Sequence, residues 1–134
     1  MSKFNNWGVS YSSITFFKDA LNTHNKVKSV VRENDIFFKI EHINNNMLNT
    51  LILDEYRFGV AGLMKALDEF PEAKYIVIGG NWNKATSEAM NYAKDNKIGI
   101  FTFSEFFGAL NYKDPLSYLK RNERKSKKNP FRSA

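Results

Sequence analysis

Hydrophobic residues recur at helical spacing near the start of the chain. From Ser13 to about Asn22, Ile14, Phe17 and Leu21 fall three or four positions apart, so they share one face of a helix. Serines before this run are preferred N-cap residues, and asparagines follow it. The pattern predicts an amphipathic helix that packs its apolar face against a core.

The pattern then changes to one that is typical of strands. A short apolar run, Val27–Arg32, is followed by Ile36–Ile43, which is rich in aromatic and β-branched residues, and by Met47–Tyr56, which is mostly aliphatic. The last two segments are separated by Asn44–Asn46, and asparagine tolerates the backbone dihedrals of tight turns. The sequence therefore predicts three consecutive strands, the second and third forming a hairpin.

After Arg57 helical and strand patterns alternate. The segments are a helix over 58–70 closed by Pro71, a buried strand over 75–78, a helix over 86–96, a strand over 98–101 and a helix over 103–110. Thr102 and Glu105 have the spacing of a capping box at the start of the last helix. The order αβββαβαβα predicts a single α/β domain over residues 1–112, in which helices flank a central mixed sheet.

Charged residues fall at the open end of the predicted hairpin. If strand pairing is centred on Asn45, the numbers of paired residues sum to about 90, which places Asp35 opposite Glu55. Side chains alternate along a strand, so Glu55 and Arg57 share a face. We expect two carboxylates and a cation to converge there, and Lys39 on the facing strand is a substitute cation. The alternative is an ordinary ion pair at a strand end.

Composition limits the classes of function. With 134 residues and 43% hydrophobic residues, the chain can bury one sizeable core. It contains no cysteine, which excludes disulfides, thiolate metal sites and a cysteine nucleophile. No apolar run approaches the roughly 18 residues of a membrane span, and the N-terminus lacks the pattern of a signal peptide. We therefore expect a cytoplasmic protein without a membrane partner.

The positive charge is concentrated at the C-terminus. Residues 1–112 contain 12 Lys and Arg against 12 Asp and Glu, whereas residues 113–134 contain 8 against 2. Such a basic, polar tail is typical of a flexible segment that contacts a phosphate backbone, and the alternative is a tail that only improves solubility. The candidate nucleic-acid contacts in the tail are Lys120, Arg121, Arg124, Lys125, Lys127 and Lys128. Nucleic acid is the favoured partner.

A polar loop with one aromatic residue precedes the helix over 86–96. Trp82 could stack on a base or a sugar, and Lys84 could contact a phosphate. In the alternative interpretation, Trp82 anchors the loop to the core. The loop is therefore a second candidate for nucleic-acid binding.

The order of elements and two motifs resemble a known superfamily. An acidic residue, Asp35, enters the second strand, and an acid-x-cation triplet, Glu55 to Arg57, ends the third. The stretch YIVIGGNWNKATSEAMNYAKDNKIGIFTFSEF, with a buried strand, a Thr-initiated helix and a last strand, is similar to the end of Mrr-type proteins. Over Ser13–Leu110 the chain thus resembles the restriction-endonuclease-like superfamily, also called PD-(D/E)xK nucleases.

This resemblance implies Mg²⁺-dependent cleavage of phosphodiester bonds, with DNA as the favoured substrate. Asp35 and Glu55 would hold the ion, and Arg57 or Lys39 would supply the catalytic cation. Arg57 stands where the family carries lysine, and arginine keeps its proton, so it suits a phosphate clamp better than a general base. The alternative is an inactive nuclease-fold module that binds DNA, RNA or another protein, and such a module could form a homodimer.

Overall fold

The computed structural model describes residues 7–34, 36–80, 83–112 and 115–116. Within these residues the elements follow one another in the order helix, four strands, helix, two strands, helix, strand and helix. Their bounds are α1 Tyr11–Asn22, β1 Val27–Asn34, β2 Phe37–His42, β3 Met47–Ile52, β4 Arg57–Phe58, α2 Val60–Glu69, β5 Tyr75–Val77, β6 Lys84–Ala85, α3 Ser87–Asp95, β7 Gly99–Phe101 and α4 Phe103–Ala109.

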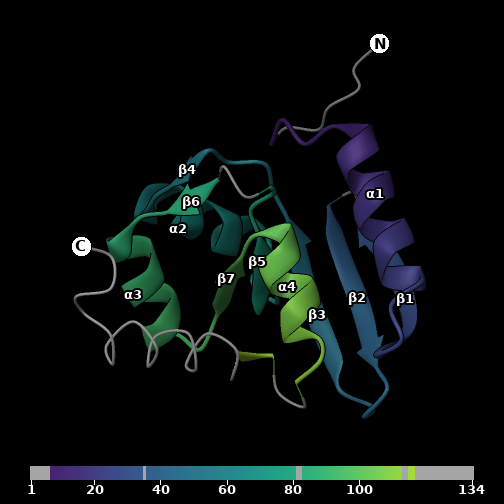
Figure 1. Cartoon of the computed structure of the whole chain (residues 1–134). Coiled ribbons are helices and arrows are strands. Elements are labelled where there is room, and N and C mark those ends of the chain that lie inside the picture. The colour runs from purple at the N-terminus through teal and green to yellow at the C-terminus, as the bar shows by residue number, and fades with distance from the viewer. Residues whose placement is uncertain (1–6, 35, 81–82, 113–114, 117–134) are drawn as a thin grey trace, which may run out of the picture.

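A five-stranded mixed sheet forms the centre of the molecule (Figure 1). Its strand order is β1-β2-β3-β5-β7, with antiparallel pairing from β1 to β3 and parallel pairing from β3 to β7. The change of direction follows from the connections, since hairpins join antiparallel strands and the helices α2 and α3 carry the chain back for parallel ones. The predicted mixed α/β class is confirmed. Among the described residues, no helix has the length and apolarity that a membrane crossing requires.

Aromatic residues hold helices against both faces of this sheet. On the face where Figure 1 shows α1 and α4, the ring of Phe17 lies 5.3 Å from that of Phe38 and 5.8 Å from that of Phe106. Side chains alternate along β2, so Phe37 points to the other face, where it stacks on Phe70 at the end of α2 with 5.8 Å between the ring centres. The core therefore extends through the sheet.

Helix starts follow the expected capping chemistry. The Thr102 side chain accepts a hydrogen bond from the Glu105 N–H, and the Glu105 carboxylate accepts one from the Thr102 N–H, which confirms the predicted capping box. Thr86 caps α3 as expected. Helix α1 begins at Tyr11, earlier than predicted, because Ser10 is its N-cap and accepts a hydrogen bond from the N–H of Ser13 over 3.1 Å.

The hairpin register differs from the prediction by two residues. Phe37 pairs with Leu51 and Glu41 pairs with Met47, so paired numbers sum to 88. The turn causes the shift, because the N–H of Asn45 donates to the His42 carbonyl over 2.8 Å and Asn45 takes a positive φ of 73°. A shift of two residues keeps every side chain on its predicted face. However, the observed register no longer places position 55 opposite position 35.

The chain also forms a second, two-stranded sheet that the pattern did not predict. Arg57 pairs with Lys84 and Phe58 with Ala85 in a parallel ladder between β4 and β6. Two backbone bonds hold it, from the Lys84 N–H to the Tyr56 carbonyl over 2.9 Å and from the Thr86 N–H to the Phe58 carbonyl over 2.8 Å. The third strand was predicted to continue to Tyr56, but it ends at Ile52 and the chain bends before β4.

Candidate functional site

Glu55 and Arg57 of the predicted cluster are described, and they do not lie on one strand. Glu55 lies beyond the end of β3, half-buried, with its N–H donating to the Ile78 carbonyl over 3.2 Å. Arg57 belongs to β4, is exposed, and forms no ion pair with Glu55. The expectation that the two share one strand was therefore wrong, because the chain bends at Tyr56. Asp35 lies outside the described residues, so its convergence with Glu55 stays a prediction.

The substitute cation, Lys39, lies on the five-stranded sheet. It pairs with Asn49 across β2 and β3, and its Nζ is 3.3 Å from a carboxylate oxygen of Glu33. The charge of Lys39 is thus paired with Glu33 in the five-stranded sheet. Arg57 lies in the two-stranded sheet, so the two candidate cations belong to different sheets.

The described residues do not assemble a metal site. Across the described ranges, no three His, Asp or Glu side chains come together in a way that could hold an ion. Asp54, the neighbour of Glu55, has its Oδ1 engaged by the Asn83 Nδ2 at 2.9 Å. We therefore derive no chemical step through Mg²⁺, and the ligand roles of Asp35 and Glu55 stay predictions.

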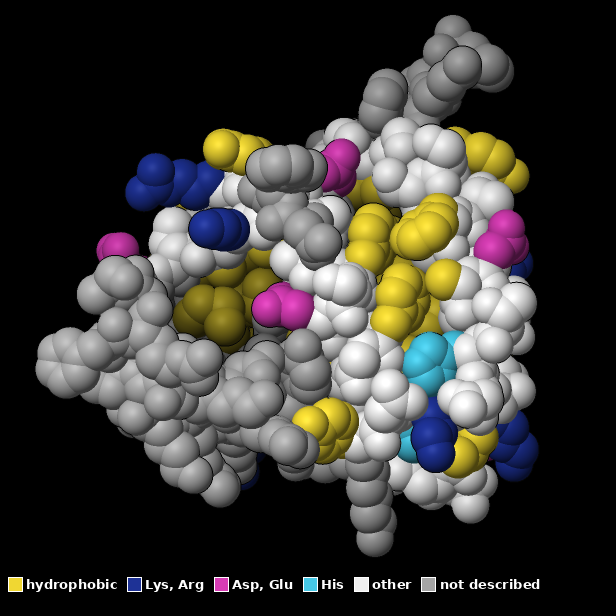
Figure 2. All heavy atoms as spheres, in the orientation of Figure 1, with side chains coloured by type: hydrophobic (Ala, Val, Ile, Leu, Met, Phe, Trp, Pro, Cys, Tyr) yellow, Lys and Arg dark blue, Asp and Glu magenta, His cyan; other side chains and the backbone are white. Residues whose placement is uncertain are grey.

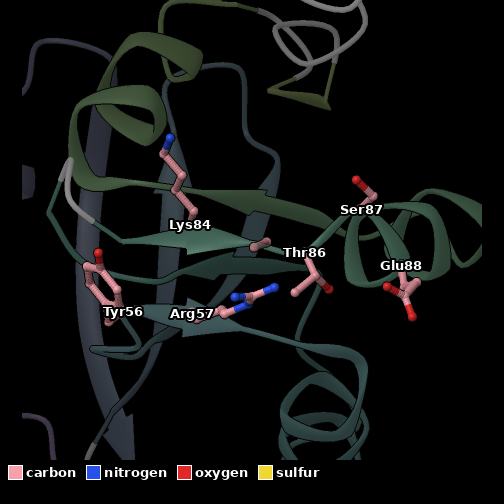
Figure 3. A pocket seen from close by; sticks show the side chains of 7 residues that line it. Tyr56, Arg57, Lys84, Thr86, Ser87 and Glu88 are labelled. Atoms are coloured by element: carbon pink, nitrogen blue, oxygen red, sulfur yellow. The ribbon is translucent and has the colours of Figure 1, made fainter.

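A hollow of about 720 Å³ lies where the two-stranded sheet meets the start of α3 (Figure 3). Ligand sites typically have volumes of about 300 to 1,000 Å³. Most of the residues around it are exposed, so it is open rather than enclosed. We call it the cationic hollow; its lining residues are Tyr56, Arg57, Lys84, Ala85, Thr86, Ser87 and Glu88.

Two positive side chains stand on neighbouring strands of the cationic hollow. Arg57 and Lys84 are direct partners in the parallel ladder, an arrangement that costs free energy when both residues carry the same charge. Neither has an acidic side chain within 4.0 Å among the residues that the structure describes. Figure 3 shows Arg57 extending toward Thr86 and Lys84 extending away from it, and Figure 2 shows basic side chains on the surface over β4 and β6.

The start of α3 forms the other side of the cationic hollow. Thr86 caps the helix by accepting a hydrogen bond from the Ala89 N–H over 3.1 Å. The N–H groups of the first turn have no acceptor within the helix, and those of Ser87 and Glu88 belong to this turn. The helix dipole adds positive potential there, which the Glu88 carboxylate partly offsets.

A buried amide joins this site to the five-stranded sheet. The Asn83 side chain is 8% exposed, and its Nδ2 donates to the Ile78 carbonyl over 2.7 Å and to Asp54 Oδ1 over 2.9 Å. Asn83 directly precedes β6, and Asp54 lies just before β4. Gly79 has a φ of +108°, and a Cβ there would lie 2.5 Å from the Asn83 Nδ2, so the position requires glycine. These contacts fix where both short strands begin.

Sequence reasoning named Arg57 and Lys84 separately but missed that they meet, and it missed Tyr56 and Glu88 altogether. Strands of two residues have no detectable period, so their pairing leaves no hydrophobic pattern. The sequence did contain one signal. Arg57 lies three residues before the first residue of α2, and Lys84 lies three residues before the first residue of α3, so both cations occupy equivalent places between a strand and a helix. Equivalent loops of a parallel sheet lie side by side at its carboxyl edge, where α/β proteins commonly bind ligands.

The other predicted nucleic-acid contacts cannot be placed in this site. Trp82 and the tail cations at positions 120 to 128 lie outside the described residues. A comparison of the chain with family models, with curated proteins and with solved structures found no match. The resemblance to the restriction-endonuclease-like superfamily therefore stays a prediction.

Proposed function

We propose that this chain binds nucleic acid, with DNA as the favoured ligand, through the cationic hollow. The observation that carries the proposal is the register of Arg57 and Lys84, two cations side by side without an acidic partner among the described residues. Both side chains add positive potential to the hollow, and a bound anion gains free energy from that potential. Phosphodiester groups are anions of this kind.

Arg57 and Lys84 would contribute to phosphate binding in different ways. The planar guanidinium of Arg57 can donate to two phosphate oxygens at once, whereas the Lys84 ammonium acts as a mobile point charge. The N–H groups at the start of α3 favour the same kind of ligand. The site is thus built for a phosphate backbone and requires no base sequence.

The basic tail is the second part of the proposal. Residues 113–134 carry 8 Lys and Arg against 2 Asp and Glu, so they attract the same ligand without a fixed geometry. Removal of Lys120 to Ala134 should leave the melting temperature unchanged, weaken binding, and reduce the slope of log affinity against log salt. An unchanged slope would eliminate the assigned role of the tail.

A charge-matched pair of double variants tests the role of the hollow. Arg57→Ala with Lys84→Ala should weaken the binding of a labelled DNA oligonucleotide at least tenfold, about 1.4 kcal/mol, in fluorescence anisotropy at fixed salt. It should also lower the salt slope by about 0.7 to 0.9 per lost phosphate contact. Lys18→Ala with Lys74→Ala removes the same charge from exposed positions away from the hollow and should change affinity by less than about twofold.

Equal losses in the two double variants would mean that only net charge matters, and the hollow would then have no special role. A full-length protein that binds neither DNA nor RNA at low salt would overturn the proposal and favour a protein-interaction module. The same assay with RNA decides which nucleic acid the hollow prefers.

Cleavage is a separate prediction of the family resemblance. If Glu55 holds a metal ion, the protein should cut DNA with Mg²⁺ or Mn²⁺, and Glu55→Gln should abolish cutting with little effect on binding. Arg57→Lys restores the residue that the family carries, so increased cutting in that variant would identify a degenerate nuclease centre. Without cutting by the wild type, the chain is a binding module.

A further inference from the structure

An exposed aromatic ring lies at the edge of the cationic hollow. Tyr56 is 75% exposed, the highest value among the large hydrophobic side chains that the structure describes. It lines the hollow, whereas Tyr11, which is 64% exposed, lies at the start of α1 and does not. An aromatic ring gains free energy when it is covered, so a ring left open beside a binding site offers a contact surface for the ligand.

The backbone of Tyr56 is fixed in relation to both cations. Its carbonyl accepts the hydrogen bond from the Lys84 N–H over 2.9 Å, and the next residue, Arg57, is the ladder partner of Lys84. Figure 3 shows Tyr56 at one end of the hollow and Glu88 at the other, with the Arg57 side chain between them and Lys84 extending to one side. The hollow therefore offers an aromatic ring, then the Arg57 cation, then a carboxylate, with the Lys84 cation at its side.

This order matches the chemistry of an unpaired nucleotide. Its base has a flat face that can stack on tyrosine, and its phosphate lies one sugar away from that face. A base inside a duplex is already stacked on both sides and must be unpaired and unstacked before tyrosine can reach it, which costs a few kcal/mol. The Glu88 carboxylate repels phosphate, so the part of the hollow beside Arg57 and Lys84 is the favoured place for it.

We propose that the cationic hollow selects single-stranded nucleic acid, with one base stacked on Tyr56 and an adjoining phosphate held by Arg57 and Lys84. This inference rests on the proposed function and specifies its substrate. The open hollow of about 720 Å³ lets a strand enter and leave, because most of its lining residues are exposed.

Conservative variants of Tyr56 test the inference in the full-length protein. The probes are a short labelled oligothymidylate and a blunt duplex of equal length, measured by fluorescence anisotropy at the same salt concentration. Tyr56→Leu should weaken binding of the single strand about tenfold, because it keeps an apolar side chain and removes the stacking face. Tyr56→Phe keeps that face and should stay within about twofold of the wild type. Tyr11→Leu is the matched control and should change neither affinity.

The outcomes separate this inference from the proposed function. If the wild type binds neither probe, both ideas fail. If it binds the duplex as tightly as the single strand, or if Tyr56→Leu weakens both probes equally, nucleic-acid binding stands and the single-strand site is overturned. Because both Tyr56 and Tyr11 are exposed, we expect all three variants to keep the wild-type circular dichroism spectrum.

Discussion

The two sheets of this protein use their charged residues differently. In the five-stranded sheet both charged side chains of β2 are paired, Lys39 with Glu33 at 3.3 Å and Glu41 with Lys28 at 3.6 Å. In the β4–β6 sheet, the charged residues are Arg57 and Lys84, which are partners in the ladder and have no acidic partner among the described residues. The charges of β2 are thus neutralised within the large sheet, whereas those of the small sheet have no acidic side chain within 4.0 Å among the described residues.

Disruption of the large sheet should produce the largest effect on stability. Phe38 is fully buried and packs against Phe17, so Phe38→Ala should lower the free energy of unfolding by about 3 to 5 kcal/mol. Phe16 is 53% exposed on the same helix as Phe17, and Phe16→Ala should cost clearly less. Urea denaturation measures both losses, and similar values would contradict the assignment of the core to this sheet.

The junction between the sheets should give an intermediate effect. Asn83→Ala removes both hydrogen bonds of the buried amide and leaves the Ile78 carbonyl without that partner, so stability should fall by about 1 to 3 kcal/mol. DNA affinity should fall as well, because Asn83 fixes the start of β6. Asn91→Ala changes an exposed asparagine on α3 and should leave both quantities near the wild-type values. If Asn83→Ala matches that control, the junction has no positioning role.

Loss of one charge from the small sheet should change stability least. Lys84→Gln keeps a polar side chain that is one atom shorter and removes one positive charge from an exposed position, so the free energy of unfolding should stay within about 0.5 kcal/mol of the wild type or rise. DNA binding should weaken in the same variant. A clear loss of stability would show that Lys84 serves the fold, which would remove the distinction between the two sheets.

Strong local patterns predicted the helices that pack on the large sheet well. The apolar face of Ile14, Phe17 and Leu21 is buried in α1 as expected, and the Thr102–Glu105 capping box begins α4. These features depend on residues near one another in the sequence, where spacing alone determines the contacts. The hairpin was found too, but its register depends on where the turn closes, and three successive asparagines leave that position open.

The candidate site could not be predicted in the same way. Arg57 and Lys84 come together because two loops meet at the carboxyl edge of the parallel strands, and two-residue strands leave no periodic signal. The prediction that Glu55 and Arg57 share one strand failed for a related reason, since the bend at Tyr56 moves the chain into another sheet. Contacts that depend on loop geometry are therefore the part of this protein that its sequence does not predict.

The most direct test of the account is a titration of the ¹⁵N-labelled full-length protein with a short oligonucleotide, followed by amide chemical shifts. The account predicts that the amides of Tyr56, Arg57, Lys84 and Ser87 move with the ligand, together with amides of the basic tail. Those of the hairpin turn, Asn44–Asn46, should stay in place. Shifts confined to the tail, or centred on the five-stranded sheet, would contradict the assignment of nucleic-acid binding to the cationic hollow.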